Sequence, residues 1–116
     1  MTIKVEMVTF DSRDAYALAD WWARQTGGRV QGEPGADFVT VAPAVEGGVM
    51  LGFQRVAEPT PGKNKVHLDM AAESRELEVE RLLAEGALEV ARHEEGGFAW
   101  VTLADPEGNV FDVSQG

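Results

Sequence analysis

The same order of predicted secondary-structure elements occurs twice along the chain, and this repeat constrains the fold more than any single motif. Each half has a strand, a helix and then three further strands. The first helix is predicted over residues 14–26, where apolar residues recur at helical spacing between Asp14, which can cap it, and two glycines that can end it. The strands of that half are predicted at residues 3–10, 29–32, 37–42 and 49–56. The second helix is predicted over residues 74–85, with strands at 65–70, 88–93, 98–104 and 109–114. When the two halves of the sequence are aligned with one constant shift in residue number, Met7 corresponds to His67. Equivalent elements therefore follow one another at the same spacing in both halves.

The repeat predicts an α+β fold with two tandem modules inside a single domain, residues 1–116. Module one is expected at residues 1–57 and module two at 64–116, joined by a linker at 58–63 that is rich in proline and glycine. In the helices, Trp22, Val79, Leu82 and Leu83 are predicted to face inward, whereas Trp21 is predicted to be half exposed.

A turn and a strand close the sequence. Residues 105–109 are turn formers, in which Pro106 fixes φ and Gly108 can adopt a positive φ. The strand that follows alternates, which places Asp112 on one face together with Val110 and Ser114. A carboxylate near the middle of a predicted strand is a candidate functional group.

Several segments in the same order carry a resemblance to a known family. They are Asp-Ser-Arg-Asp at residues 11–14, Gly-Phe-Gln-Arg-Val at 52–56, Pro-Gly-Lys-Asn-Lys-Val-His-Leu-Asp-Met at 61–70, and the closing segment at 105–113. Together they resemble the vicinal oxygen chelate superfamily of glyoxalases, bleomycin resistance proteins and extradiol dioxygenases, in its glyoxalase-like domain branch. The resemblance covers essentially the whole chain. It implies two βαβββ modules that form a cup-shaped, incompletely closed mixed β-sheet barrel with two outer helices, commonly in a homodimer.

The resemblance also implies four inward positions that can hold a divalent metal. In this sequence they are Met7, Gly52, His67 and Asp112. A thioether is a soft ligand and glycine has no side chain, so only His67 and Asp112 suit a hard or borderline cation. A metal ion at this site would need water, substrate oxygens or a group from a partner chain to complete its coordination shell.

His67 has three open interpretations. It alternates with Lys65 and Asp69 on the polar face of the predicted strand. It could be a metal ligand, a catalytic base or substrate contact paired with Asp112, or one half of a structural His–Asp pair. Asp69 is the candidate group that orients it. The other histidine, His93, is expected in a solvated loop without a role.

Further candidates are ligand contacts. Gln54 shares a strand face with Gly52 and offers a neutral amide, and Gly52 is expected to leave space for a bulky organic ligand. Met7, Asp69 and Trp100 are predicted to line the same cavity, where an aromatic surface suits a planar or cationic metabolite. The aromatic residues Tyr16, Trp21 and Phe53 are expected near outer faces, which predicts a homodimer.

Composition narrows the class of function. The 116 residues carry a formal net charge of −10, which argues against nucleic-acid binding. The absence of cysteine excludes disulfides, thiolate metal sites and cysteine nucleophiles. No apolar stretch reaches membrane-spanning length, so no membrane association and a cytoplasmic location are expected.

Three functions therefore stay open. The first is binding of a small organic molecule in the cup without a complete metal site, as in resistance and sequestration proteins. The second is a divalent-metal-dependent lyase, isomerase or dioxygenase that uses His67 and Asp112. The third is a structural domain with a vestigial cavity, which the polar face around His67 argues against.

Overall fold

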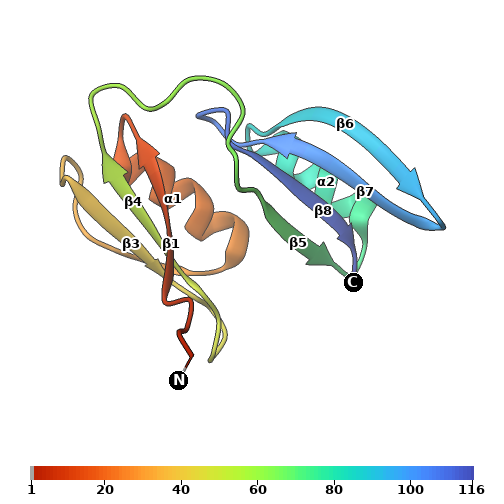
Figure 1. The fold of residues 1–116 in the computed structure, drawn as a ribbon, viewed down its shortest axis with the longest axis horizontal. Coiled ribbons are helices and arrows are strands. Elements are labelled where there is room, and N and C mark those ends of the chain that lie inside the picture. Colours follow the sequence, from red (N-terminus) through yellow and green to blue (C-terminus); the bar gives the residue numbers. More distant parts are fainter. Residues whose placement is uncertain (1) are drawn as a thin grey trace. The chain divides into compact units, whose positions relative to one another are not determined.

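The computed structural model describes residues 2–116, which contain eight strands and two helices (Figure 1). In chain order, the elements are β1 (Met7–Ser12), α1 (Ala15–Thr26), β2 (Arg29–Gln31), β3 (Phe38–Ala42), β4 (Met50–Arg55), β5 (Leu68–Ala72), α2 (Arg75–Ala84), β6 (Leu88–Glu95), β7 (Phe98–Ala104) and β8 (Val110–Gln115). The chain divides into two compact units between Thr60 and Pro61, a boundary that lies inside the predicted linker at residues 58–63.

Each unit contains one four-stranded mixed sheet. The strand orders are β1-β4-β3-β2 and β5-β8-β7-β6, and in each sheet the first strand runs parallel to the last strand of its unit. The remaining neighbours are antiparallel. This arrangement confirms the predicted α+β fold of two tandem βαβββ modules. In the described part of the chain the two sheets are not closed into a barrel. Neither helix in residues 2–116 is long and apolar enough to cross a membrane.

In the first unit, α1 packs against one face of its sheet. The Asp14 side chain caps the helix by accepting a hydrogen bond from the Ala17 amide at 3.1 Å, and Gly27 ends it with φ of 74°. The helix buries Leu18 and Trp22 against sheet residues such as Phe53. Phe10 stacks on Phe53, with a distance of 5.0 Å between their ring centroids. These contacts form the core of the first unit.

The prediction that Trp21 and Phe53 lie near outer faces is wrong. Trp21 is 4% exposed and Phe53 is fully buried. The buried stripe of α1 is wider than predicted, because it includes Trp21 as well as Leu18 and Trp22. Phe53 faces α1 because side chains alternate along β4. These two aromatic residues therefore give no support for a homodimer.

In the second unit, α2 covers the apolar sheet face. The Ser74 hydroxyl caps the helix by accepting from the Leu77 amide at 3.3 Å. Val79 and Leu82 are buried as predicted, together with the sheet residues Val101, Leu103, Phe111 and Val113. Leu83, predicted to face inward, is 41% exposed, because α2 packs mainly on β8 and β5 and its buried stripe is narrow.

The first strand of each module begins later than predicted. Residues 3–6 precede β1 and residues 65–67 precede β5. Pairing explains both starts: β1 begins where Met7 meets Met50 of β4, and β5 begins where Leu68 meets Phe111 of β8. A strand extends only as far as a partner can accept its hydrogen bonds.

Candidate functional site

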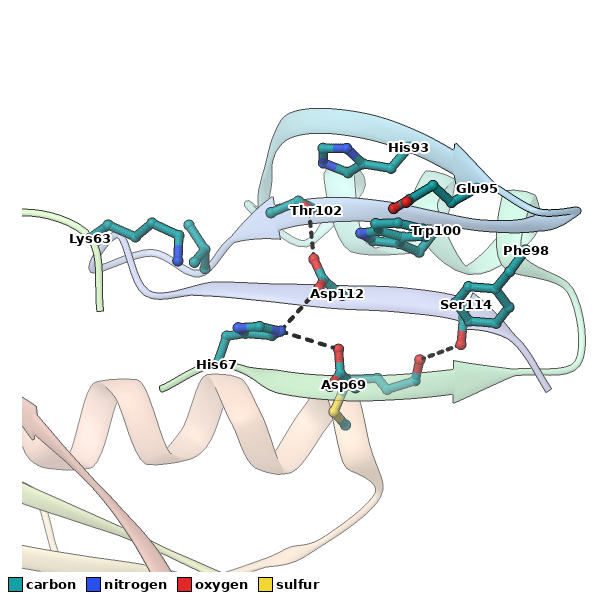
Figure 2. Close-up of a pocket in the computed structure, with 12 residues that line it drawn as sticks. Lys63, His67, Asp69, His93, Glu95, Phe98, Trp100, Thr102, Asp112 and Ser114 are labelled. Carbon is teal, nitrogen blue, oxygen red and sulfur yellow. Dashed lines mark hydrogen bonds and ion pairs between the residues drawn. The ribbon is translucent and has the colours of Figure 1, made fainter. Parts of the chain in front are cut away.

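One face of the second sheet is covered by α2, and the opposite face carries polar side chains. Asp112, in the middle of β8, lies in register between Asp69 of β5 and Thr102 of β7. Paired residues on neighbouring strands point to the same side of a sheet. His67 lies two residues before Asp69 and points to the same side (Figure 2).

The closing turn fixes the position of β8. The Asp105 carboxylate is 2% exposed and accepts hydrogen bonds from the amides of Glu107 and Asn109, both at 2.9 Å. Gly108 adopts the positive φ, 87°, that the turn requires. The predicted turn is thereby confirmed, and it starts β8 at Val110, which brings Asp112 opposite Thr102.

Asn64 fastens the chain that leads to His67. Its side-chain oxygen accepts from the Val110 amide at 2.8 Å, and its amide group donates to the carbonyls of Val110 and Val66 at 3.1 and 2.7 Å. The side chain thus takes the place of a strand partner at the first residue of β8. His67 is held beside β8 although it precedes β5.

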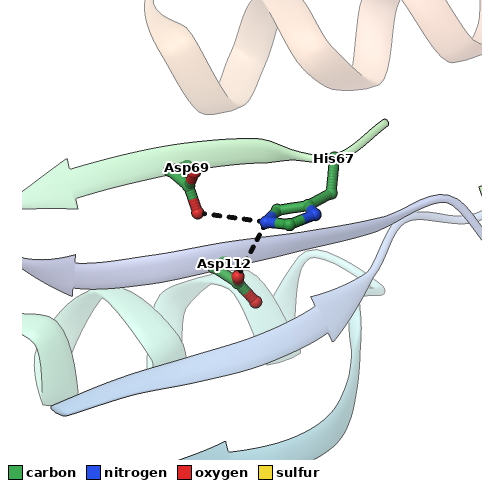
Figure 3. A group of neighbouring side chains, drawn as sticks. All are labelled: His67, Asp69 and Asp112. Carbon is green, nitrogen blue, oxygen red and sulfur yellow. Dashed lines mark ion pairs between the residues drawn. The ribbon is translucent and has the colours of Figure 1, made fainter. Parts of the chain in front are cut away.

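Three side chains meet at this face (Figure 3). His67 Nε2 lies 3.2 Å from Asp112 Oδ2 and 3.4 Å from Asp69 Oδ1. Thr102 Oγ1 donates to the other Asp112 oxygen, Oδ1, at 2.5 Å. The side chains of His67, Asp69 and Asp112 are 41%, 75% and 16% exposed, so Asp112 is the partly buried anchor of the group.

A cavity of about 790 Å³ opens over this face. His67, Asp69, Thr102 and Asp112 line it, and aromatic side chains from β6 and β7 line it beside them. Trp100, predicted to lie on a central strand and to line a cavity, does both. All of the lining residues belong to the second unit.

The prediction that His93 lies in a solvated loop is wrong. His93 is part of β6, pairs in register with Trp100 and stacks on its ring, with 5.0 Å between the centroids. The sequence contained a signal for this hairpin, because two adjacent glycines suit a two-residue turn. In the structure Gly96 and Gly97 form that turn, with φ of 57° and 83°. Such a turn pairs Glu95 with Phe98 and therefore His93 with Trp100.

The predicted site residues of the first unit lie on the sheet face that points away from α1. Met7 on β1 is 37% exposed, and Gln54 on β4 is exposed. Their placement in one cavity with Trp100 stays a prediction. The expected free space at Gly52 is absent: an added Cβ would lie 2.9 Å from Met7 Sδ, 2.9 Å from Thr9 Oγ1 and 3.0 Å from Phe38 Cζ. These side chains fill the room that the glycine leaves.

The polar group of the second unit fits a divalent cation in part. One imidazole nitrogen and two carboxylate oxygens, from His67, Asp69 and Asp112, lie within 4.8 Å of one another. A cation at about 2.1 Å from each donor would place the donors roughly 3.0–3.4 Å apart. The distances from His67 Nε2 to the two aspartate oxygens fall in this interval. Direct contacts between the imidazole and the carboxylates, with no cation between them, have the same distances. Met7 and Gly52 offer no hard donor to complete the shell.

Comparison with known proteins agrees with the fold. The sequence matches the family model of the glyoxalase-like domain over residues 7–114.

A glyoxalase/bleomycin resistance protein/dioxygenase family enzyme from Burkholderia phytofirmans is 22% identical and superposes with a TM-score of 0.78, over 97% of this chain and 98% of that one. A member of the same superfamily from Sphaerobacter thermophilus is 16% identical, with a TM-score of 0.74 over 99% and 98% of the two chains. A lactoylglutathione lyase from Agrobacterium tumefaciens is 17% identical, with a TM-score of 0.70 over 99% and 95%. No curated protein matches the sequence significantly. The family match spans nearly the whole chain and agrees with the predicted resemblance, so this protein belongs to the glyoxalase-like domain family.

Proposed function

We propose that this protein binds a small organic molecule in the cavity of its second module, without a complete divalent-metal site. The observation that carries the proposal is the cavity itself, which combines a row of aromatic rings with the His67–Asp69–Asp112 group. Its volume of about 790 Å³ lies in the range of small-molecule sites. Cavities of that kind are apolar surfaces with a few polar groups that fix the orientation of the ligand.

The roles of the residues follow from their chemistry. The imidazole of His67 can donate or accept a hydrogen bond, and Asp112 beside it can accept a hydrogen bond or stabilise a positive charge on the ligand. Asp69 orients the imidazole from the other side. Trp100 offers a flat apolar surface.

A second candidate is a divalent-metal-dependent lyase, isomerase or dioxygenase. The specific observation in its favour is that three metal-ligating groups converge within 4.8 Å. His67, Asp69 and Asp112 would hold the ion, and Thr102 would keep the Asp112 carboxylate in place. A bound divalent cation would polarise an oxygen of the substrate. The exposure of His67 and Asp69, 41% and 75%, favours the metal-independent proposal, because water competes with exposed ligands.

A thermal-shift screen separates the candidates. The protein is heated with a metabolite library and, separately, with Mg²⁺, Mn²⁺, Zn²⁺ or Ni²⁺, with and without a chelator. Whatever binds only the native state raises the melting temperature. The proposal predicts stabilisation by an organic compound that the chelator leaves unchanged and that His67→Ala and Trp100→Leu remove. Stabilisation that depends on metal supports the second candidate and contradicts the first.

We also propose that the protein is a homodimer, which the family resemblance supports. Sedimentation velocity at micromolar concentration tests this directly. A monomer throughout the concentration series would contradict it.

A further inference from the structure

The ligand-binding face of the second sheet consists of rows that cross the strands. In the order β6, β7, β8 and β5, one row contains His93, Trp100, Ser114 and Ala71. It begins with two rings and ends with two small side chains. The His93 ring lies nearly parallel to Trp100, at an interplanar angle of 21°, and occupies one side of it. On the other side of Trp100 in this row the next residue is Ser114, which has a short side chain (Figure 2).

We define the Trp100 shelf as the part of the cavity wall formed by Trp100 and Ser114. Phe98 borders it, with its ring centroid 5.7 Å from that of Trp100. Aromatic surfaces of this kind hold planar ligands by offset stacking. The cavity contains the shelf, since Trp100, Ser114 and Phe98 all line it.

Negative charge lies at the edge of the shelf. The adjacent row on the same face contains Asp112 and Asp69, each two residues along its strand from the first row. That spacing corresponds to roughly 7 Å, about the width of a six-membered ring with its substituent. Among the described residues that line the cavity, Asp69, Glu95 and Asp112 are carboxylates, whereas Lys63 is the single ammonium group. The whole chain has a formal net charge of −10, which adds to the attraction of a cation.

We propose that the ligand is a planar organic cation, stacked on Trp100 above Ser114 with its charged N–H groups directed at Asp112 and Asp69. This inference rests on the proposed function and adds the chemical class of the ligand. Suitable groups are an aromatic amidine, an aryl guanidine or a protonated nitrogen heterocycle. Such a group combines donors for the carboxylates with a face for the indole, and a cation near an indole ring gains further from its quadrupole.

Four matched probes test the class by isothermal titration calorimetry. Benzamidine is planar and cationic, benzamide is planar and neutral, benzoate is planar and anionic, and cyclohexanecarboxamidine is cationic but not flat. We expect benzamidine to bind about tenfold or more tightly than benzamide and than the cyclohexane analogue, and benzoate not to bind. The tryptophan fluorescence should be quenched by benzamidine in the wild type and not in Trp100→Phe, because Trp21 and Trp22 are buried in the first unit.

Variants locate the site. Asp112→Asn keeps the shape of the side chain and removes its charge, and we expect it to weaken benzamidine binding on the order of tenfold. Trp100→Leu removes the stacking surface and should weaken binding to a similar extent. Glu80→Gln changes the charge equally on the exposed side of α2, away from the cavity, and should leave binding unchanged. Circular dichroism melting curves confirm that each variant is folded.

Two results would overturn the inference: equal affinity for benzamide and benzamidine, or benzamidine binding that Asp112→Asn and Trp100→Leu leave unchanged. Its failure is distinguishable from failure of the proposed function. If neutral or anionic compounds bind in a manner that depends on Trp100 while benzamidine does not, small-molecule binding stands and the cationic class is wrong. If no organic compound binds at all, both are wrong.

Discussion

The hydrogen bond from Thr102 to Asp112 gives the most direct test of how the site is held together. Thr102→Val removes the hydroxyl and keeps the side-chain shape, so no cavity is created. The lost bond is short, 2.5 Å, and its acceptor is a carboxylate that is 16% exposed. A hydrogen bond to a charged group contributes about 1.5–3 kcal/mol to the free energy of unfolding. Water reaches Asp112 in part, so we expect a loss near the lower end, about 1.5–2 kcal/mol, and a fall in Tm of roughly 5–10 °C.

Urea unfolding followed by circular dichroism at neutral pH measures this loss. The same change is made in an Asp112→Ala background, where the Thr102 hydroxyl no longer has this acceptor. There Thr102→Val should lower the free energy of unfolding by less than about 0.5 kcal/mol, which gives a coupling energy of at least about 1 kcal/mol between the two residues. An equal loss in both backgrounds would refute the reasoning, because the effect would then come from Thr102 alone.

Three further predictions concern single changes. His67→Ala should remove ligand binding, which calorimetry measures. It should change the free energy of unfolding by less than about 1 kcal/mol in the urea assay, because the contact between His67 and Asp112 is partly exposed and Asp112 keeps its hydrogen bond from Thr102. Gly52→Ala should lower the free energy of unfolding by about 1–3 kcal/mol in the same assay, because its Cβ would lie within 3.0 Å of three side-chain atoms; an unchanged stability would show that they move aside freely. Hydrogen bonds, chiefly from Arg92, lower the pKa of Glu76, so this carboxylate stabilises the fold above its unfolded pKa and loses that contribution as the pH falls through its folded pKa. Glu76→Gln should therefore lower the urea midpoint at neutral pH and not in acid, and an equal effect at both pH values would contradict the assignment.

Local chemistry allowed the sequence to predict the closing turn and the helix starts. Asp105, Asp14 and Ser74 each satisfy neighbouring backbone amides, and such contacts depend only on residues a few positions apart. The register of β8 follows from that turn. The convergence of His67 and Asp112 was predicted from alternation along each strand together with the fold that the family resemblance implies, in which the first and last strands of a module lie side by side.

Features that depend on contacts between distant segments were predicted less well. The start of β5 depends on its pairing with β8, and the burial of Trp21 depends on the segments that pack around α1. His93 was missed for a different reason. Its charged neighbours suggested a loop, whereas the glycine pair after it defines a tight hairpin that brings its ring onto Trp100.

The repeat permits a comparison of equivalent positions in the two modules. His67 and Asp112 of module two correspond to Met7 and Gly52 of module one. In module two these positions carry an imidazole and a carboxylate, and a cavity lies over them. In module one the corresponding face is filled by its own side chains, with the Met7 sulfur and the Phe38 ring packed over Gly52. A divalent ion that required ligands from both modules would find none in module one among these positions. The asymmetry therefore favours a site whose polar contacts come from module two.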